Sequence, residues 1–235
     1  MSAGLFGKLP AKRDFVAANA PRRFLETWEP WLQSGVAMSR QAIGADWVES
    51  YNRAPIWRYW LGADFCGEAL IGAFMPSVDG VGRAFPLTIF FTEGEDALAP
   101  PEIDDNGPWC DDAEALLLSA LDAGATLEAI TEHLAALPQP KLRQRSESVP
   151  GFCELPDGGT LINTGDSAVS AAFYAARRFA HRRVFAAQSF WWTIGGEGFP
   201  PCALAYVGLP PPARFSDFLT GAFVETTTAS SGEST

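Results

Sequence analysis

Residues 85–91 read FPLTIFF, and this stretch does most to decide the fold. Nearly every position in it is apolar, so a strand formed here has two apolar faces. Such a strand is usually covered on both sides, which favours a central place in a layered α/β sheet. Pro86 cannot donate a hydrogen bond to a neighbouring strand, so we expect it at the very start of this one.

Other strands are expected on both sides of this stretch in the sequence. Residues 76–82 read PSVDGVG, which is rich in turn formers and predicts a hairpin-like connection from a preceding strand. A short first strand is expected to stop at Pro10. The segments that we predict to be strands are 4–9, 56–61, 69–75, 85–92, 160–163, 190–194 and 203–207.

A long amphipathic helix is predicted over residues 21–43, where apolar side chains recur at helical spacing. Pro30 is expected to kink or split it, because proline removes an internal hydrogen bond. Further helices are predicted from the N-cap residue Asp46 to Arg53, and from an N-cap at Asp111 or Asp112 to about residue 122.

Three more helices complete the prediction. Thr126 is expected to cap a helix with one apolar stripe, formed by Leu127, Ile130, Leu134 and Leu137. Residues 168–180 predict a helix with small and aromatic residues on one face, and Phe215, Phe218 and Leu219 predict a closing amphipathic helix.

This mixture of strands and helices predicts an α/β fold, a three-layer α/β/α sandwich around a mixed, largely antiparallel sheet. The basic, polar segment 141–150 is the best internal boundary, but we favour one domain over residues 1–224. The small, polar residues 225–235 are expected to form a disordered tail.

Charge is strongly segregated along the chain. Residues 84–140 contain twelve carboxylates and no lysine or arginine, so the rest of the chain sums to about +1 of the net charge of −11. Such a distribution predicts a one-sided surface that selects and steers partners. The acidic balance argues against nucleic acid as the main ligand, because phosphate binding needs a basic face.

The sequence offers no strong catalytic or metal-binding pattern. Residues 4–9 are too short between their glycines for a phosphate loop. The two histidines, His133 and His181, are expected at the surface, and the four cysteines contain no C-x-x-C pair. We therefore predict no catalytic residue, no cofactor, no metal and no membrane insertion, and a cytoplasmic location, although hydrolysis by paired carboxylates stays open on composition.

Three segments combine charged, turn-forming and aromatic residues: 4–16, 76–87 and 189–193. One interpretation is that Asp14, Asp79 and Arg83 cap turns and form ion pairs that fix the loops. The other interpretation is that they form the edge of a recognition surface.

These segments resemble the TagF family of type VI secretion accessory proteins. Residues 4–16, GLFGKLPAKRDFV, are similar to the family's G-x-x-G-K-x-P-x-x-G-D-F-[VI] block, with Arg13 in place of its last glycine. If that glycine serves a turn with positive φ, Arg13 must be strained or the turn must differ. Residues 55–59 (PIWRY), 75–88 (MPSVDGVGRAFPLT) and 189–193 (SFWWT) resemble the remaining motifs, so the likeness covers about residues 4–220. The motif residues that are candidates for interaction are Lys8, Asp14, Phe15, Trp57, Arg58, Ser77, Asp79, Arg83, Trp191 and Trp192.

The resemblance implies an α/β/α sandwich and a cytoplasmic, post-translational repressor of type VI secretion. Its implied partner is the forkhead-associated scaffold protein of the system, and it implies no catalytic residues. The acidic region 93–114 is expected to steer the encounter, with exposed aromatic side chains as anchors. Two alternatives stay open: an accessory component of the apparatus, and an enzyme with its small-ligand pocket lined by Lys8, Asp14, Ser77, Asp79 and Arg83.

Overall fold

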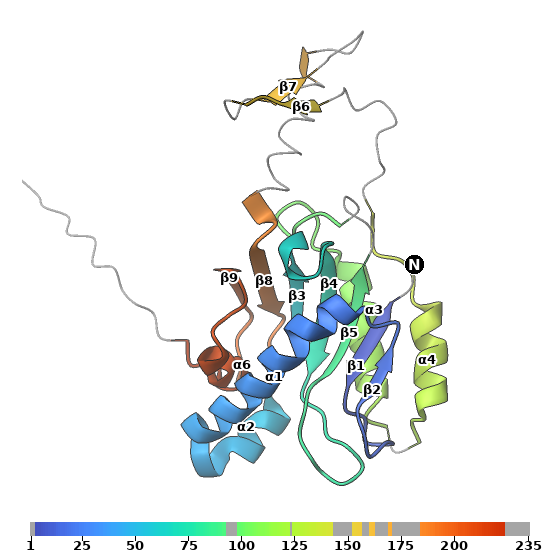
Figure 1. Cartoon of the computed structure of the whole chain (residues 1–235). Helices are drawn as coiled ribbons and strands as arrows, with labels where there is room; N and C mark the ends of the chain where they lie inside the picture. The colour runs from blue at the N-terminus through green and yellow to red at the C-terminus, as the bar shows by residue number, and fades with distance from the viewer. Residues whose placement is uncertain are drawn as a thin grey trace, which may run out of the picture.

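The protein is built around a seven-stranded sheet, as the computed structural model in Figure 1 shows. The structure describes residues 3–92, 98–122, 124–142, 152–156, 160–162, 169–170 and 184–223. The strand order is β2-β1-β5-β4-β3-β8-β9, and every described pair of strands is antiparallel. The strands are β1 (Gly4–Gly7), β2 (Val16–Ala18), β3 (Trp57–Leu61), β4 (Leu70–Met75), β5 (Leu87–Thr92), β8 (Gln188–Thr193) and β9 (Cys202–Val207). A separate two-stranded sheet joins β6 (Phe152–Glu154) and β7 (Thr160–Ile162).

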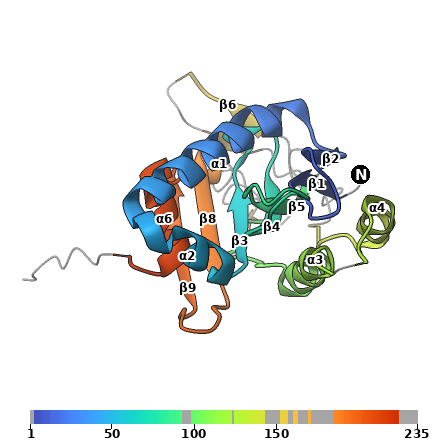
Figure 2. The same ribbon diagram turned by 90° about the horizontal axis from the view of Figure 1, so that it is seen from below.

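Helices lie against both faces of the large sheet, as Figure 2 shows. The described helices are α1 (Arg22–Ile43), α2 (Trp47–Arg53), α3 (Gly107–Ser119), α4 (Leu127–Ala136) and α6 (Phe215–Thr220), with 3-10 turns at Gly44–Asp46, Ala63–Phe65 and Pro212–Arg214. Successive strand residues point to opposite faces. Tyr59 therefore joins a core with α1, α2 and α6, whereas the next residue, Trp60, joins a second core with α3 and α4.

Aromatic rings dominate the core beneath α1. Trp28 is fully buried and stacks on Tyr59, with ring centroids 4.4 Å apart, and on Trp191, with centroids 5.8 Å apart. Its indole nitrogen donates a hydrogen bond to Thr88 Oγ1 at 3.1 Å. Buried aromatic pairs add to the free energy of area burial, so this cluster ties α1 to three central strands.

The predicted split at Pro30 is wrong, whereas a kink stays a prediction. α1 continues through this residue as one helix of 22 residues. Pro30 is exposed, so water can hydrate the backbone carbonyl that has no amide donor at residue 30. Trp28, Trp31 and Leu32 stay buried on the opposite side of the helix. An internal proline costs roughly 3 kcal/mol, and this packing outweighs it.

The predicted start of the third long helix is also wrong. α3 begins at Gly107 with Asn106 in the N-cap position, so Asp111 and Asp112 lie inside the helix. Pro108 occupies its first turn, where a proline's missing amide hydrogen has no intrahelical partner to lose. Asp46 takes its predicted place before α2, but its side chain makes no capping hydrogen bond.

Several predictions are confirmed. β5 is the third of seven strands, with its first five residues buried, and Pro86 immediately precedes it. Thr126 caps α4, since its side chain accepts a hydrogen bond from the amide of Ala129 at 3.1 Å. The α/β class and the antiparallel sheet are confirmed, but the described strands show no parallel pairing. The complete sandwich stays a prediction, because the expected helix 168–180 lies almost wholly outside the described residues. Most of the boundary segment 141–150 and the whole tail 225–235 also lie outside them.

Candidate functional site

Two motif segments that are about seventy residues apart in sequence meet at one end of the sheet. The connection from β1 to β2 and the connection from β4 to β5 lie together at the bottom of Figure 1. The amide of Gly80 donates a hydrogen bond to the carbonyl of Lys12 at 2.7 Å, and the guanidinium of Arg83 donates one to the carbonyl of Arg13. We call residues 10–15 and 78–83 together the motif tip.

Asp79 is the centre of this arrangement. Its side chain has no solvent exposure, and its oxygens accept hydrogen bonds from the backbone amides of Val81, at 3.1 Å, and Arg83, at 2.9 Å. It also forms ion pairs with Lys8 Nζ at 3.0 Å and Arg83 Nε at 2.6 Å. Burial alone would raise the pKa of the Asp79 carboxyl, but these donors outweigh it and hold the pKa well below its usual range.

Lys8, Ser77 and Tyr51 fix the base of the tip. Lys8 is buried, and its ammonium lies 5.2 Å from the centre of the Phe15 ring. Ser77 Oγ donates to the carbonyl of Lys8 at 2.8 Å. The Tyr51 hydroxyl donates to the Ser77 carbonyl at 3.0 Å and accepts from the Ser77 amide at 3.1 Å. Tyr51 lies in α2, outside the recognised motifs, so no local sequence pattern indicates that it belongs to this network.

The exposed part of the motif tip is both apolar and cationic. Phe15 is 45% exposed and Val81 is 57% exposed. The Phe15 ring is held edge-on against Phe85, with centroids 4.8 Å apart. Arg13 and Asp14 are exposed, and their side chains form no hydrogen bond or ion pair with another described residue. Arg13 does not have positive φ, so the strain considered for an arginine at the glycine position of the motif does not occur.

The other candidate residues lie away from the motif tip, on β3 and β8. Trp57 is buried, and its indole nitrogen donates to the carbonyl of Phe218 at 2.9 Å. Trp191 is fully buried and donates to Ser189 Oγ at 2.9 Å, whereas Trp192 is half-buried. Trp57 and Trp191 hold helices and strands together, so the structure favours a packing role for both.

Arg58 is a buried cation that joins the sheet to the acidic segment. Its guanidinium contacts Glu114 Oε1 at 2.6 Å and Asp111 Oδ1 at 2.7 Å, and its side chain is 6% exposed. Burial would lower the pKa of Arg58, but the hydrogen bonds that its guanidinium donates to both carboxylates raise this pKa above its usual value. Asp104 is similarly paired with Lys141 at 2.8 Å. Three carboxylates of the region 93–114 therefore form ion pairs within the chain and are less available to steer a partner.

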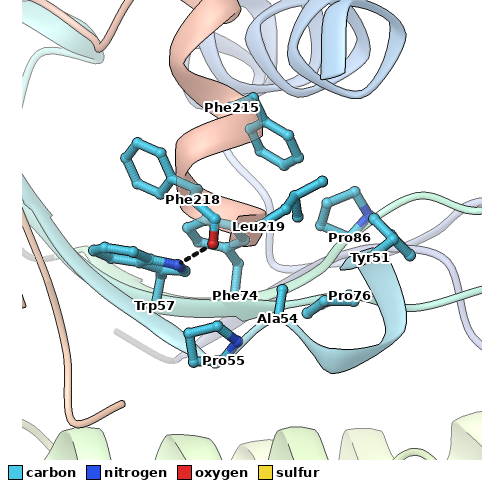
Figure 3. Close-up of a pocket in the computed structure, with 10 residues that line it drawn as sticks. All are labelled: Tyr51, Ala54, Pro55, Trp57, Phe74, Pro76, Pro86, Phe215, Phe218 and Leu219. Atoms are coloured by element: carbon cyan, nitrogen blue, oxygen red, sulfur yellow. Dashed lines mark hydrogen bonds between the residues drawn. The ribbon is translucent and has the colours of Figure 1, made fainter. Parts of the chain in front are cut away.

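The described structure contains two cavities, one near the motif residues and one between the helices α3 and α4. Figure 3 shows an apolar cleft of about 10 Å³ at the base of the motif tip, which has room for roughly one water molecule. Its lining residues are Tyr51, Ala54, Pro55, Trp57, Phe74, Pro76, Pro86, Phe215, Phe218 and Leu219. A shallow groove of about 370 Å³ between α3 and α4 is lined by residues including His133 and Leu137.

The residues considered for an enzymatic pocket do not line either cavity. Lys8, Ser77, Asp79 and Arg83 converge, but they bond to one another and to the backbone. Asp14 forms no hydrogen bond or ion pair with them among the described residues. Within the described ranges, no group of three or more histidine, cysteine or acidic side chains is placed to hold a metal ion. In the same ranges, no helix is long and apolar enough to cross a bilayer.

Comparison with known proteins decides the family. Residues 4–137 match the family model described as the TagF N-terminal domain, type VI secretion system-associated. The chain belongs to the TagF family. A crystal structure of PA0076 from Pseudomonas aeruginosa PAO1 is similar in fold, with a TM-score of 0.78 and 32% sequence identity over 95% of this chain and 96% of that one. None of the curated proteins matches the sequence. Membership of the TagF family makes this a type VI secretion-associated protein.

The Asp79 network predicts a specific dependence of stability on pH. Because the native pKa of Asp79 lies below its unfolded value of about 3.9, the ionised carboxylate stabilises the fold fully above that pH. This contribution is lost as pH falls towards the native pKa. Asp79→Asn should therefore be less stable than the natural chain at pH 7, and the difference should shrink below about pH 4.

Urea unfolding of both chains between pH 2.5 and 7 measures this difference. Asp14→Asn is the matched control, because that exposed side chain has no described partner. A difference for Asp79→Asn that stays constant across the whole range would contradict the role given to its charge.

Proposed function

We propose that this TagF-family protein is a non-enzymatic, post-translational negative regulator of bacterial type VI secretion. It acts in the cytoplasm by binding the forkhead-associated scaffold protein of the system, and it occupies a surface that assembly needs. Membership of the TagF family supports the link to type VI secretion. The choice of partner and the repressor role follow from what the family motifs imply, and they are part of the proposal.

The observation that supports the binding role is the buried ion pair beneath the motif tip. Asp79 and Lys8 place two buried charges under an exposed pair of loops, whose outer surface carries Phe15, Val81 and Arg13. Buried ion pairs are often no more stabilising than apolar packing, so loop geometry is the more direct benefit. A preformed loop loses less conformational entropy on binding, which favours affinity.

The chemistry of the tip defines the surface that it fits. Phe15 and Val81 are suited to an apolar recess, whereas Arg13 favours a carboxylate beside that recess. The other two cations of the tip, Lys12 and Arg83, already pair with Glu128 and Asp79. The complementary surface on the scaffold is therefore an apolar hollow with an acidic rim. In this arrangement the seven-stranded sheet and its helices act as the base that presents the tip.

Capture of the purified scaffold tests the proposal directly. The immobilised protein should retain the forkhead-associated protein at low and moderate salt, and Arg13→Glu should reduce the retained amount. The control is Arg53→Glu, because Arg53 is an exposed arginine on α2. Arg40→Glu is less suitable, since the Arg40 side chain lies over the Trp47 ring. Absence of capture under all of these conditions would count against the proposed partner.

Gene deletion separates repression from an accessory role in the apparatus. Loss of a repressor should increase secretion by an otherwise intact system, and complementation should restore the original level. Reduced secretion in the deletion strain would instead identify a component that the apparatus needs.

Association with the scaffold should slow as ionic strength rises. The exposed Arg13 of the tip and the net negative charge of region 93–114 both orient the approaching partner at long range, and salt screens such effects. We expect the association rate constant to fall about tenfold between 50 and 500 mM salt, with a smaller change in dissociation. Stopped-flow mixing measures this rate, and a value independent of salt would remove the steering role.

A further inference from the structure

The strand β9 leaves one edge of the large sheet open among the described residues. Its other edge pairs with β8, in the register Ser189↔Tyr206 and Trp191↔Leu204. The amide of Gly208 donates to the carbonyl of Ala187 at 2.7 Å, which continues the same register. Along an antiparallel pair of strands, hydrogen-bonded residue pairs alternate with non-hydrogen-bonded ones. The backbone groups of Tyr206, Leu204 and Cys202 therefore bond to β8. Ala203, Ala205 and Val207 consequently direct their backbone N–H and C=O groups away from the sheet.

No charge or internal proline guards this edge. β9 reads CALAYV, and the three outward-bonding residues are also exposed, with Val207 at 82%. Natural proteins usually protect an edge strand with lysine, proline, a bulge or very short length. The opposite edge strand, β2, has only three residues and so follows that practice. β9 has six residues and uses none of these devices.

The described segment that contains β9 carries little charge. Residues 184–223 contain three charged side chains, Glu197, Arg214 and Asp217, and the last two pair with each other at 3.0 Å. The acidic helix α3 packs on β4 and β5, and its carboxylates reach Arg58 on β3, two strands away from β9. Two strand spacings make roughly 10 Å, which exceeds the screening length of about 8 Å at physiological salt. Repulsion between two acidic copies is therefore weak when they meet through β9.

We infer that β9 pairs with the β9 strand of a second copy of this chain to form a symmetric dimer. An antiparallel pair with its two-fold axis at Ala205 places Ala205 opposite Ala205 and Ala203 opposite Val207, each pair exchanging two hydrogen bonds. All side chains that then face each other across the strands are uncharged, so no like charges oppose. The two sheets become one continuous sheet across the axis.

Prolines set the length of this contact. Pro200 and Pro201 precede β9, and Pro210, Pro211 and Pro212 follow it, so neither end can extend the ladder with backbone donors. An interface of one strand edge falls at the small end of the range for specific contacts. The dimer should therefore dissociate in the micromolar range and exchange readily with the monomer.

Sedimentation equilibrium of the full chain tests this inference without any partner. The natural protein should show a mass that rises with concentration from 25.3 kDa towards twice that value. Ala205→Lys places a charge at the axis, opposite its own copy, on an exposed side chain that the fold does not bury. This variant should remain at the monomer mass, with at least a tenfold weaker association.

Ala17→Lys is the matched control, because Ala17 is an exposed alanine on the opposite edge strand, and it should associate like the natural chain. A natural chain that stays monomeric up to about millimolar concentration would overturn the inference. Circular dichroism checks that Ala205→Lys is folded. If this folded variant associates as strongly as the natural chain, the inference is also overturned. If the natural chain is monomeric and Ala205→Lys instead loses capture of the scaffold, β9 receives a strand of that partner and the dimer is wrong.

Discussion

Arg58→Met is expected to lower the free energy of unfolding by about 3 kcal/mol. The substitution keeps an apolar side chain in the buried position. It leaves Glu114, which is 12% exposed, without the Arg58 guanidinium, whose Nε lies 2.6 Å from Glu114 Oε1. Breaking a buried pair costs about 3–5 kcal/mol, and the partial exposure of the two carboxylates favours the lower end. For a chain of this length, the melting temperature should fall by about 10 °C.

Urea denaturation measures the loss, and two variants show that it comes from the unpaired charge. Arg22→Met breaks an ion pair of similar length, 2.8 Å, but that arginine is 91% exposed and the change should cost below about 1 kcal/mol. Adding Glu114→Gln to Arg58→Met removes the uncompensated carboxylate, so the double variant should regain part of the stability. Equal losses for Arg58→Met and Arg22→Met would contradict the structural role of the buried pair.

Phe15→Ala is expected to weaken binding to the forkhead-associated scaffold by about 30-fold, which corresponds to about 2 kcal/mol. The ring is 45% exposed at the centre of the proposed contact surface, and its fixed position against Phe85 and under Lys8 prepares it for an apolar recess. Large aromatic anchors of this kind carry most of the binding energy in protein interfaces. Isothermal titration calorimetry with the purified scaffold measures the change.

Met38→Ala provides the matched control, because Met38 lies on α1 and is 43% exposed, close to the value for Phe15. It should bind like the natural chain. Phe15→Leu, which keeps an apolar side chain over Phe6, should lose less affinity than Phe15→Ala. Natural affinity in a folded Phe15→Ala chain would show that the motif tip is not the contact surface.

The sequence predicted those parts of the fold that depend on local signals. The apolar run of β5, the turn-rich connection before it and the cap at Thr126 each lie within a few neighbouring residues. α3 begins earlier than predicted because Asp111 and Asp112 resemble N-cap residues, although the fixed φ of Pro108 suits a first helical turn. α1 is not split at Pro30 because the burial of its apolar face, a tertiary effect, outweighs the local penalty.

The candidate site depended more on tertiary structure. Asp79 and Arg83 were expected to form ion pairs in a turn, and the ion pair between them is present at 2.6 Å. Lys8 joins them from a different strand, and Tyr51 joins Ser77 from a helix, through contacts that no local pattern encodes. Resemblance alone also grouped Trp57 and Trp191 with the tip residues, whereas their burial separates them.

Hydrogen–deuterium exchange of the complex with the forkhead-associated scaffold tests the central claim most directly. We predict slower exchange in peptides covering residues 10–15 and 78–83 when the scaffold is saturating, and unchanged exchange in β3 and α4. Complex formation that leaves both tip segments unchanged and protects another surface would contradict the account, as would the absence of any complex between the purified proteins.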